Sequence, residues 1–200
     1  MPRPLSHADL SDFRARLCQA AEALFAAHGP EAVTMRQLAT ALGVSAMTPY
    51  TYFKDKDAIL AAVRAAAFTR FAARLEAAYT GEAEPVAASN AVGAAYVAFA
   101  REEPAAYRLM FDLSQPTEDQ YPELAAAGRR ARATMTAHVK GLIDAGYLQG
   151  DPEMIGHIFW AAQHGAIVLE MAGKLPASVD PERLRVGVLA AVVRGLGMGR

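Results

Sequence analysis

The sequence predicts an all-α protein of about nine helices. Alanine, the residue with the highest helix propensity, makes up much of an apolar share of 53%. The β-branched residues are scattered and never alternate with polar residues over the length of a strand. A chain of 200 residues with this composition is long enough to bury a substantial core.

Apolar residues spaced three and four apart predict the helices, and capping residues and glycines predict their ends. The first helix stops at Gly29, and Thr34 caps the second helix, with Gln37 completing a capping-box pattern. Gly43 ends the second helix in a tight turn, and Ser45 is expected to cap a short third one. Apart from the short third helix, the helices are predicted over 8–28, 34–42, 56–79, 86–103, 104–112, 122–145, 151–172 and 180–196. A loop is predicted over 113–122.

Two short helices that are joined by a glycine turn and backed by a longer helix match the helix-turn-helix unit, whose second helix enters the DNA major groove. The polar segment TGEAEP, residues 80–85, marks the expected boundary between domains. We therefore expect a helix-turn-helix domain over 8–55, a linking helix over 56–79 and a second helical domain over 80–200.

The overall charge gives no sign of a nucleic-acid or membrane partner, because 20 Lys and Arg face 21 Asp and Glu. The single Cys18 cannot form an internal disulfide, and the N-terminal residues hold no apolar run typical of a signal peptide. The most apolar stretch, 158–172, is interrupted by Gln163, His164 and Glu170 and is too polar for a membrane span. We expect a cytoplasmic protein that does not bind membranes.

The local charge between residues 34 and 56 is positive, since Arg36, Lys54 and Lys56 face only Asp55. Hydroxyl and ammonium groups on this segment suit phosphate oxygens and base edges. Phe53 is expected to be a core anchor, and for the neighbouring tyrosines packing remains the alternative to DNA contact. The polar candidates for DNA contact are Thr34, Arg36, Ser45, Thr48, Tyr50, Thr51, Tyr52 and Lys56.

The segments TMRQLATALGVS, residues 34–45, and YTYFKDKDAIL, residues 50–60, resemble the N-terminal motif of the TetR family of transcriptional regulators. The second half resembles one branch of that family, through WAAQHGAIVLEMAGKL from Trp160 and EEPAAYRLMFDL from Glu102. The resemblance implies a DNA-binding regulator, more often a repressor, that is released from a palindromic operator by a small molecule. It adds Ala46 and Met47 to the recognition helix and gives Lys56 a phosphate-binding role.

The recognition segment departs from the family pattern at Pro49, where many members have a core leucine. Ala46 and Met47 offer no hydrogen bonds to bases, so apolar contact with thymine methyl groups is their expected contribution. Proline is tolerated there if it lies in the first turn of a helix.

A small, largely apolar effector is expected between the helices of the second domain. For each candidate, ordinary core packing remains the alternative, and His164 is expected to be satisfied by a side chain or a carbonyl. The candidates are Tyr96, Phe99, Tyr107, Met110, Phe111, Met135, His138, Phe159, Trp160 and His164.

The last two helices are expected to form a homodimer, as the resemblance implies. Residues 186–197, VGVLAAVVRGLG, are apolar over most of the helix circumference and small enough for close approach. A helix of this kind can also lie at the centre of a monomer, and that alternative stays open.

We expect no metal, no cofactor and no enzymatic activity. Glu153, His157 and His164 share one predicted helix, but no further ligand converges on them. The chain has no nucleophile elbow, phosphate loop or paired-carboxylate pattern. The alternative to a regulator is a helical small-molecule-binding or interaction protein with a vestigial helix-turn-helix.

Overall fold

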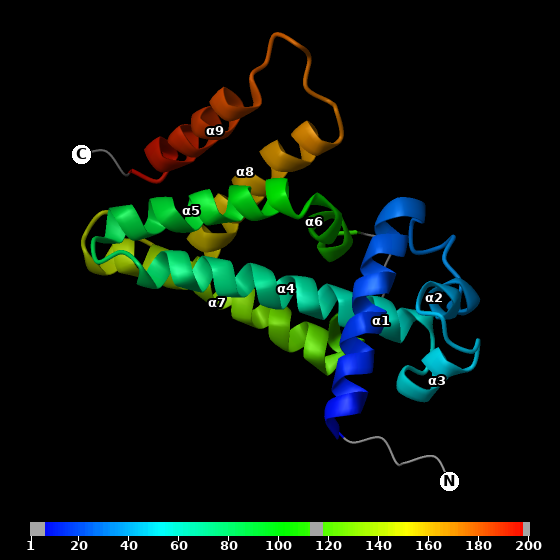
Figure 1. The fold of residues 1–200 in the computed structure, drawn as a ribbon. Coiled ribbons are helices and arrows are strands. Elements are labelled where there is room, and N and C mark those ends of the chain that lie inside the picture. Colours follow the sequence, from blue (N-terminus) through cyan, green and yellow to red (C-terminus); the bar gives the residue numbers. More distant parts are fainter. Residues whose placement is uncertain (1–6, 113–117, 198–200) are drawn as a thin grey trace. The chain divides into compact units, whose positions relative to one another are not determined.

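The computed structural model describes residues 7–112 and 118–197. These residues form nine α-helices, one short 3-10 helix and no strand, which confirms the predicted all-α class (Figure 1). The bounds of the eight helices for which the sequence gives a range lie within two residues of the predicted ones. The helices are α1 (His7–His28), α2 (Met35–Ala41), α3 (Thr48–Tyr52), α4 (Lys56–Thr80), α5 (Pro85–Glu102), α6 (Pro104–Met110), η1 (Glu118–Gln120), α7 (Pro122–Asp144), α8 (Pro152–Met171) and α9 (Pro181–Gly195).

Local signals set several of these ends. The Thr34 side chain accepts a hydrogen bond from the Gln37 backbone, and the Gln37 side chain accepts one from the Thr34 backbone, so the predicted capping box is confirmed. Gly43 has a φ of 66°, the left-handed conformation that a tight turn after a helix requires. Of the predicted loop, residues 113–117 lie outside the described residues, and residues 118–120 form η1.

The prediction that Ser45 caps the third helix is wrong. Helix α3 begins at Thr48, and its N-cap is Met47, which makes no side-chain capping hydrogen bond. The Ser45 carbonyl accepts from the Thr48 amide at 3.0 Å, which extends the turn instead of starting the helix. Pro49 consequently falls in the first turn of α3, where its missing N–H removes no intrahelical hydrogen bond.

The chain packs as two compact units, each drawn from more than one stretch of sequence. The first unit runs to Thr69 and also takes Glu103–Gly128, while the second holds Arg70–Glu102 and the chain from Arg129 onward. Helix α4 therefore contributes its residues up to Thr69 to the first unit and those from Arg70 onward to the second. Helix α6 belongs with the helix-turn-helix because it packs on α1 and its Leu109 joins that unit's hydrophobic core.

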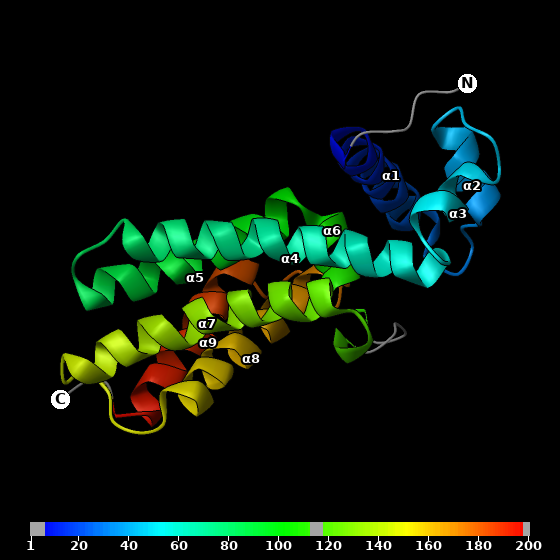
Figure 2. The same ribbon diagram turned by 90° about the horizontal axis from the view of Figure 1, so that it is seen from below.

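The second unit contains α5, α8, α9 and the later parts of α4 and α7. Its core includes Phe71 and Phe99, which meet edge to face with ring centroids 5.1 Å apart. A second buried cluster is centred on Val139, Leu142 and Ile155. Helices α8 and α9 pack against each other (Figure 2).

The described residues hold neither a membrane-spanning helix nor a metal-binding cluster. None of their helices combines the length and the apolar character that crossing a bilayer demands. No cluster of three or more His, Cys, Asp or Glu side chains among them has a geometry that could hold a metal ion. His157, a candidate ligand in the sequence, is exposed, and its Nδ1 lies 2.8 Å from the Glu153 carbonyl oxygen.

Candidate functional sites

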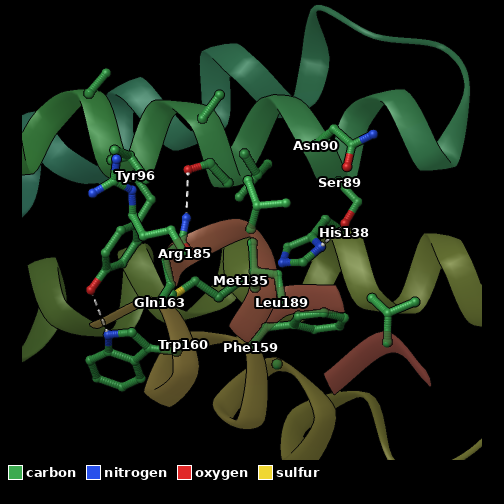
Figure 3. A pocket seen from close by; sticks show the side chains of 18 of the residues that line it. Ser89, Asn90, Tyr96, Met135, His138, Phe159, Trp160, Gln163, Arg185 and Leu189 are labelled. Carbon is green, nitrogen blue, oxygen red and sulfur yellow. Dashed lines mark hydrogen bonds between the residues drawn. The ribbon is translucent and has the colours of Figure 1, made fainter. Parts of the chain in front are cut away.

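A cavity of about 470 Å³ lies among α5, α7, α8 and α9 in the second unit (Figure 3). Its volume falls in the range of small-molecule binding sites, and aliphatic and aromatic side chains form much of its wall. Of the ten residues predicted to bind an effector, five line it: Tyr96, Met135, His138, Phe159 and Trp160.

The other five predicted residues lie outside this lining. Tyr107, Met110 and Phe111 belong to the first unit, where the ring of Phe111 meets that of Tyr107 edge to face at 4.9 Å. Phe99 is fully buried in the core of the second unit. His164 is half-buried, with its Nδ1 3.4 Å from the Tyr96 hydroxyl, which is the kind of side-chain partner that the sequence predicted for it.

Hydrogen bonds between the helices hold the polar side chains of the cavity. The Trp160 indole N–H donates to the Tyr96 hydroxyl at 3.0 Å, and this joins α8 to α5 (Figure 3). Ser89 Oγ lies 3.1 Å from His138 Nδ1 and joins α5 to α7. Burial lowers the pKa of His138 to about 4 and also lowers the pKa of His164. His138 is therefore an uncharged imidazole at neutral pH.

Sequence reasoning missed two buried polar residues in the cavity wall. Gln163 on α8 is 7% exposed and Arg185 on α9 is 3% exposed. Arg185 forms ion pairs with Glu170 and Glu182. The signal that could have found them is a polar residue within an otherwise apolar helical stretch.

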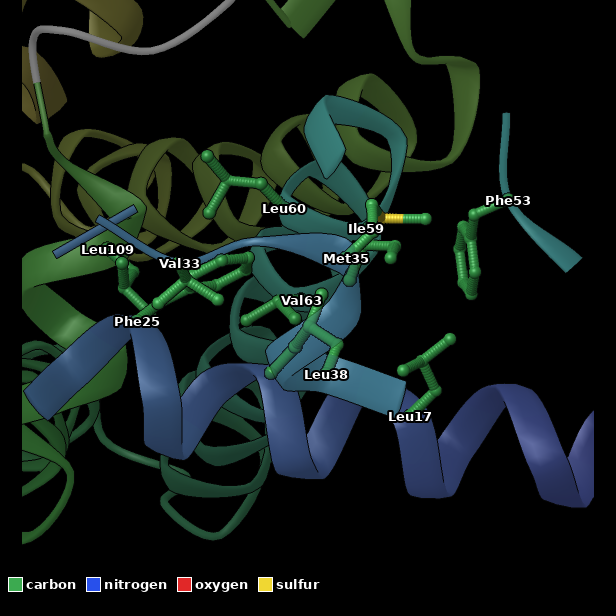
Figure 4. Close-up of a cluster of buried hydrophobic side chains, with 11 residues drawn as sticks. Leu17, Phe25, Val33, Met35, Leu38, Phe53, Ile59, Leu60, Val63 and Leu109 are labelled. Carbon is green, nitrogen blue, oxygen red and sulfur yellow. The ribbon is translucent and has the colours of Figure 1, made fainter. Parts of the chain in front are cut away.

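The inner side of the helix-turn-helix is a packed apolar core in the first unit (Figure 4). Phe53 is 5% exposed and belongs to this core, which confirms its predicted role as an anchor. Pro49 is the buried residue of α3 and thus takes an inward position, where many members of the resembled family have leucine. The Arg14 guanidinium lies over the Phe53 ring at 4.5 Å from its centroid.

The ten predicted DNA contacts lie on α2, α3, the turn between them and the start of α4. Met47 and Tyr50 are large side chains left 70% and 48% exposed. The Ser45 and Thr48 hydroxyls hydrogen-bond each other at 2.9 Å. Seven of the ten are exposed and three are half-buried; the exposed ones are Thr34, Arg36, Ser45, Ala46, Met47, Tyr50 and Thr51, and the half-buried ones are Thr48, Tyr52 and Lys56.

Lys56, which is predicted to bind a DNA phosphate, also forms hydrogen bonds within the protein. Its Nζ donates to the carbonyl of Pro30 at 2.7 Å and to that of Glu31 at 3.4 Å. These bonds tie the start of α4 to the turn that follows α1. An ammonium group has three N–H donors, so one remains for a phosphate oxygen.

The thiol of Cys18 is not poised for nucleophilic chemistry. Burial is the main cause that raises its pKa to about 11, so the reactive thiolate is scarce at neutral pH.

Two family models match the chain. "Bacterial regulatory proteins, tetR family" matches residues 17–63, and "Tetracyclin repressor-like, C-terminal domain" matches residues 89–192. The second match alone spans more than half of the chain. No significant match is found among curated proteins.

Solved structures share the fold over nearly the full length. A protein of unknown function from Rhodococcus sp. RHA1 is 28% identical, with a TM-score of 0.80 over 97% of this chain and 98% of its own. The TetR-family regulator PfmR from Thermus thermophilus is 21% identical, with a TM-score of 0.67 over 92% of this chain and 99% of its own. SmeT, the repressor of the Stenotrophomonas maltophilia efflux pump SmeDEF, is 22% identical, with a TM-score of 0.69 over 91% of this chain and 89% of its own.

The two model matches account for both halves of the molecule. The first covers the helix-turn-helix with its exposed polar surface, and the second covers the helices around the cavity. The chain belongs to the tetR family of bacterial regulatory proteins, and it is a DNA-binding transcriptional regulator rather than an enzyme.

Proposed function

We propose that this regulator is a repressor that leaves a palindromic operator when a small, largely apolar effector fills the cavity of the second unit. The observation that carries the proposal is that cavity, which has the volume of a small-molecule site and an aromatic and aliphatic wall. SmeT, one of the structures with the same fold, is itself a repressor.

The DNA-binding surface in this proposal consists of the ten residues predicted from the sequence. Its support is the exposure of α3 side chains such as Tyr50 and of Arg36 on α2. Backbone contacts would position the helix, while Thr48, Thr51, Arg36 and the apolar Met47 would meet base edges.

The partner in this proposal is a second copy of the chain, bound through α8 and α9. Both helices leave apolar side chains uncovered: Met154 is 61% exposed, Leu169 is 44% exposed and Val186 is 60% exposed. A partner copy that covers these side chains would remove apolar surface from water, which favours association. A twofold dimer reads two half-sites about 34 to 36 Å apart, or a multiple of that spacing.

Helix α4 would carry the response in this proposal. Its first part supplies Ile59 and Val63 to the core of the DNA-binding unit, and its second part supplies Phe71 and Leu75 to the core of the other unit. An effector that binds one arrangement of α4 more tightly shifts the population toward it. The spacing of the two recognition helices then no longer matches successive major grooves.

The test is a gel shift of the full chain with the DNA that flanks its own gene, at several salt concentrations. We expect a complex whose affinity falls steeply with salt, because phosphate contacts release counterions. Arg36→Ala should weaken the complex, whereas Lys174→Ala, an exposed cation in the α8–α9 loop, should not. Salt-insensitive or absent binding would contradict the proposal.

A further inference from the structure

The amide of Gln163 is a polar group that the protein satisfies only in part. Its Nε2 donates to the Gly93 carbonyl at 3.3 Å, which fixes the amide orientation because a carbonyl accepts only from the NH₂ side (Figure 3). Its Oε1 is buried and has no hydrogen-bond partner among the described residues. Gln163 and Gly93 both line the cavity.

A buried acceptor without a donor is unfavourable, and a bound molecule can reverse that. Leaving such an atom unsatisfied forfeits the hydrogen bonds that it makes to water in the unfolded chain. Because Oε1 has almost no accessible surface, a ligand must first displace the side chains that cover it. A ligand that then presents an N–H or O–H to Oε1 recovers the lost hydrogen bond, whereas a purely apolar ligand does not. The Gln163 amide therefore discriminates between ligands of similar shape.

The charges at the cavity balance one another. Arg101 and Arg185 lie against two carboxylates, those of Glu170 and Glu182. The imidazole of His138, which also lines the cavity, is neutral because burial lowers its pKa. A charged ligand would meet no unpaired counter-charge here, so no new ion pair would offset the hydration that it loses.

We propose that the cavity selects an uncharged, mainly apolar molecule that carries an N–H or O–H donor, and that Gln163 Oε1 accepts the hydrogen bond that orients it. The inference rests on the proposed function and specifies the chemical class of its effector. It also makes Gln163 a residue that determines specificity.

The test uses fluorescent probes that share one scaffold. N-phenyl-1-naphthylamine is uncharged and has one N–H, its N-methyl derivative lacks that N–H, and 8-anilino-1-naphthalenesulfonate adds a negative charge. The corresponding N,N-dimethylsulfonamide is close to the sulfonate in size, carries no charge and adds no N–H donor. Each probe is titrated into the full chain and its dissociation constant is measured from the rise in fluorescence.

We expect the N-methyl derivative to bind about tenfold more weakly than the parent amine, since one hydrogen bond to a buried acceptor is lost. The sulfonate should bind at least about tenfold more weakly than the sulfonamide. Gln163→Leu should weaken the parent amine to the level of its N-methyl derivative and leave the derivative unchanged.

Gly93→Leu is the matched control for the location of the probes. Gly93 lines the cavity, and an added Cβ there meets no atom within 4 Å, so the leucine side chain starts in open space. Only the fluorescence that this variant abolishes is attributed to the cavity. Circular dichroism and thermal unfolding establish that both variants are folded.

Three results would overturn the inference. The first is that Gly93→Leu abolishes the binding of none of the probes. The second is that the sulfonate binds in the cavity as tightly as the sulfonamide, and the third is that Gln163→Leu still binds the parent amine more tightly than its N-methyl derivative. Its failure is separable from failure of the proposed function. If the amine binds as expected but never releases DNA in the gel shift, the ligand class stands and the regulatory proposal fails.

Discussion

The ring of Tyr52 stacks on the ring of Phe13, with centroids 4.2 Å apart and planes inclined by 25°. The contact joins α3 to α1, and Arg14 adds to it by donating to the Tyr52 carbonyl at 3.4 Å. Tyr50, two residues earlier, is 48% exposed. The two tyrosines of the recognition helix therefore have different surroundings, although both were expected from the sequence to play the same role.

This difference predicts that the two alanine substitutions affect different properties, stability for Tyr52 and DNA binding for Tyr50. Tyr52→Ala should lower the free energy of unfolding by about 2 kcal/mol, because a stacked ring is lost from a packed contact. Tyr50→Ala should change it by less than about 0.5 kcal/mol yet weaken DNA binding by about tenfold. Urea denaturation and fluorescence anisotropy with operator DNA measure the two quantities.

Tyr52→Phe separates packing from phosphate contact at this position. The variant keeps the ring on Phe13 and should retain full stability. If its DNA affinity is also unchanged, Tyr52 contributes packing alone and leaves the set of proposed DNA contacts.

Lys56 is expected to stabilise the first unit as well as to bind DNA. Lys56→Met removes the charged donor that holds the Pro30 carbonyl at 2.7 Å, and it should lower the free energy of unfolding by about 1.5–3 kcal/mol. Lys54→Met, at an exposed position of the same segment, should leave stability unchanged. Equal stability of the two variants in urea denaturation would contradict the structural role of Lys56.

Local signals explain how much of the fold could be predicted. The capping box of Thr34 and Gln37 and the turn at Gly43 depend on a few consecutive residues, and the structure has both. The prediction that Ser45 caps the third helix was wrong because a serine before a helix can precede its first turn by several residues. Here the chain makes another turn before α3 begins.

The cavity was harder to predict because its lining depends on which faces of four helices meet. Aromatic residues such as Phe159 and Trp160 were identified by type, but the same reasoning selected Tyr107, which α6 carries into the core of the first unit. Gln163 stood out only as a polar interruption of an apolar stretch. That its Oε1 lacks a hydrogen-bond partner depends on how α5 and α8 pack, which the sequence does not show.

The hydrogen bond from Trp160 to Tyr96 gives a third prediction. Tyr96→Phe leaves the indole N–H without that acceptor and removes the hydroxyl next to His164. The free energy of unfolding should fall by about 1–2 kcal/mol, which lowers Tm by about 2–8 °C in a chain of this length. Tyr147→Phe, at a position that is 49% exposed, is the control and should not change Tm. A Tm of Tyr96→Phe equal to wild type would show that this network does not stabilise the fold.

The buried imidazole of His138 predicts a loss of stability in mild acid. Burial lowers its pKa in the folded chain from 6.5 to about 4, so the unfolded chain binds a proton that the folded chain does not over this interval. Stability therefore falls as the pH drops from about 6.5 toward 4, by up to about 3 kcal/mol from this residue alone. Urea denaturation at pH 7, 5.5 and 4.5 should show the decline.

Two variants assign the acid effect to this side chain. His138→Gln retains a hydrogen-bonding group near Ser89 without a titratable ring, so the decline between pH 7 and 4.5 should become smaller by most of that amount. His157→Gln replaces an exposed imidazole and should leave the wild-type profile intact. Carboxylates with lowered pKa values, such as Glu76, remain in every variant, so only the difference between profiles reports on His138. If the His138→Gln profile parallels that of wild type, the imidazole is protonated in the folded chain and the cavity carries a positive charge in mild acid.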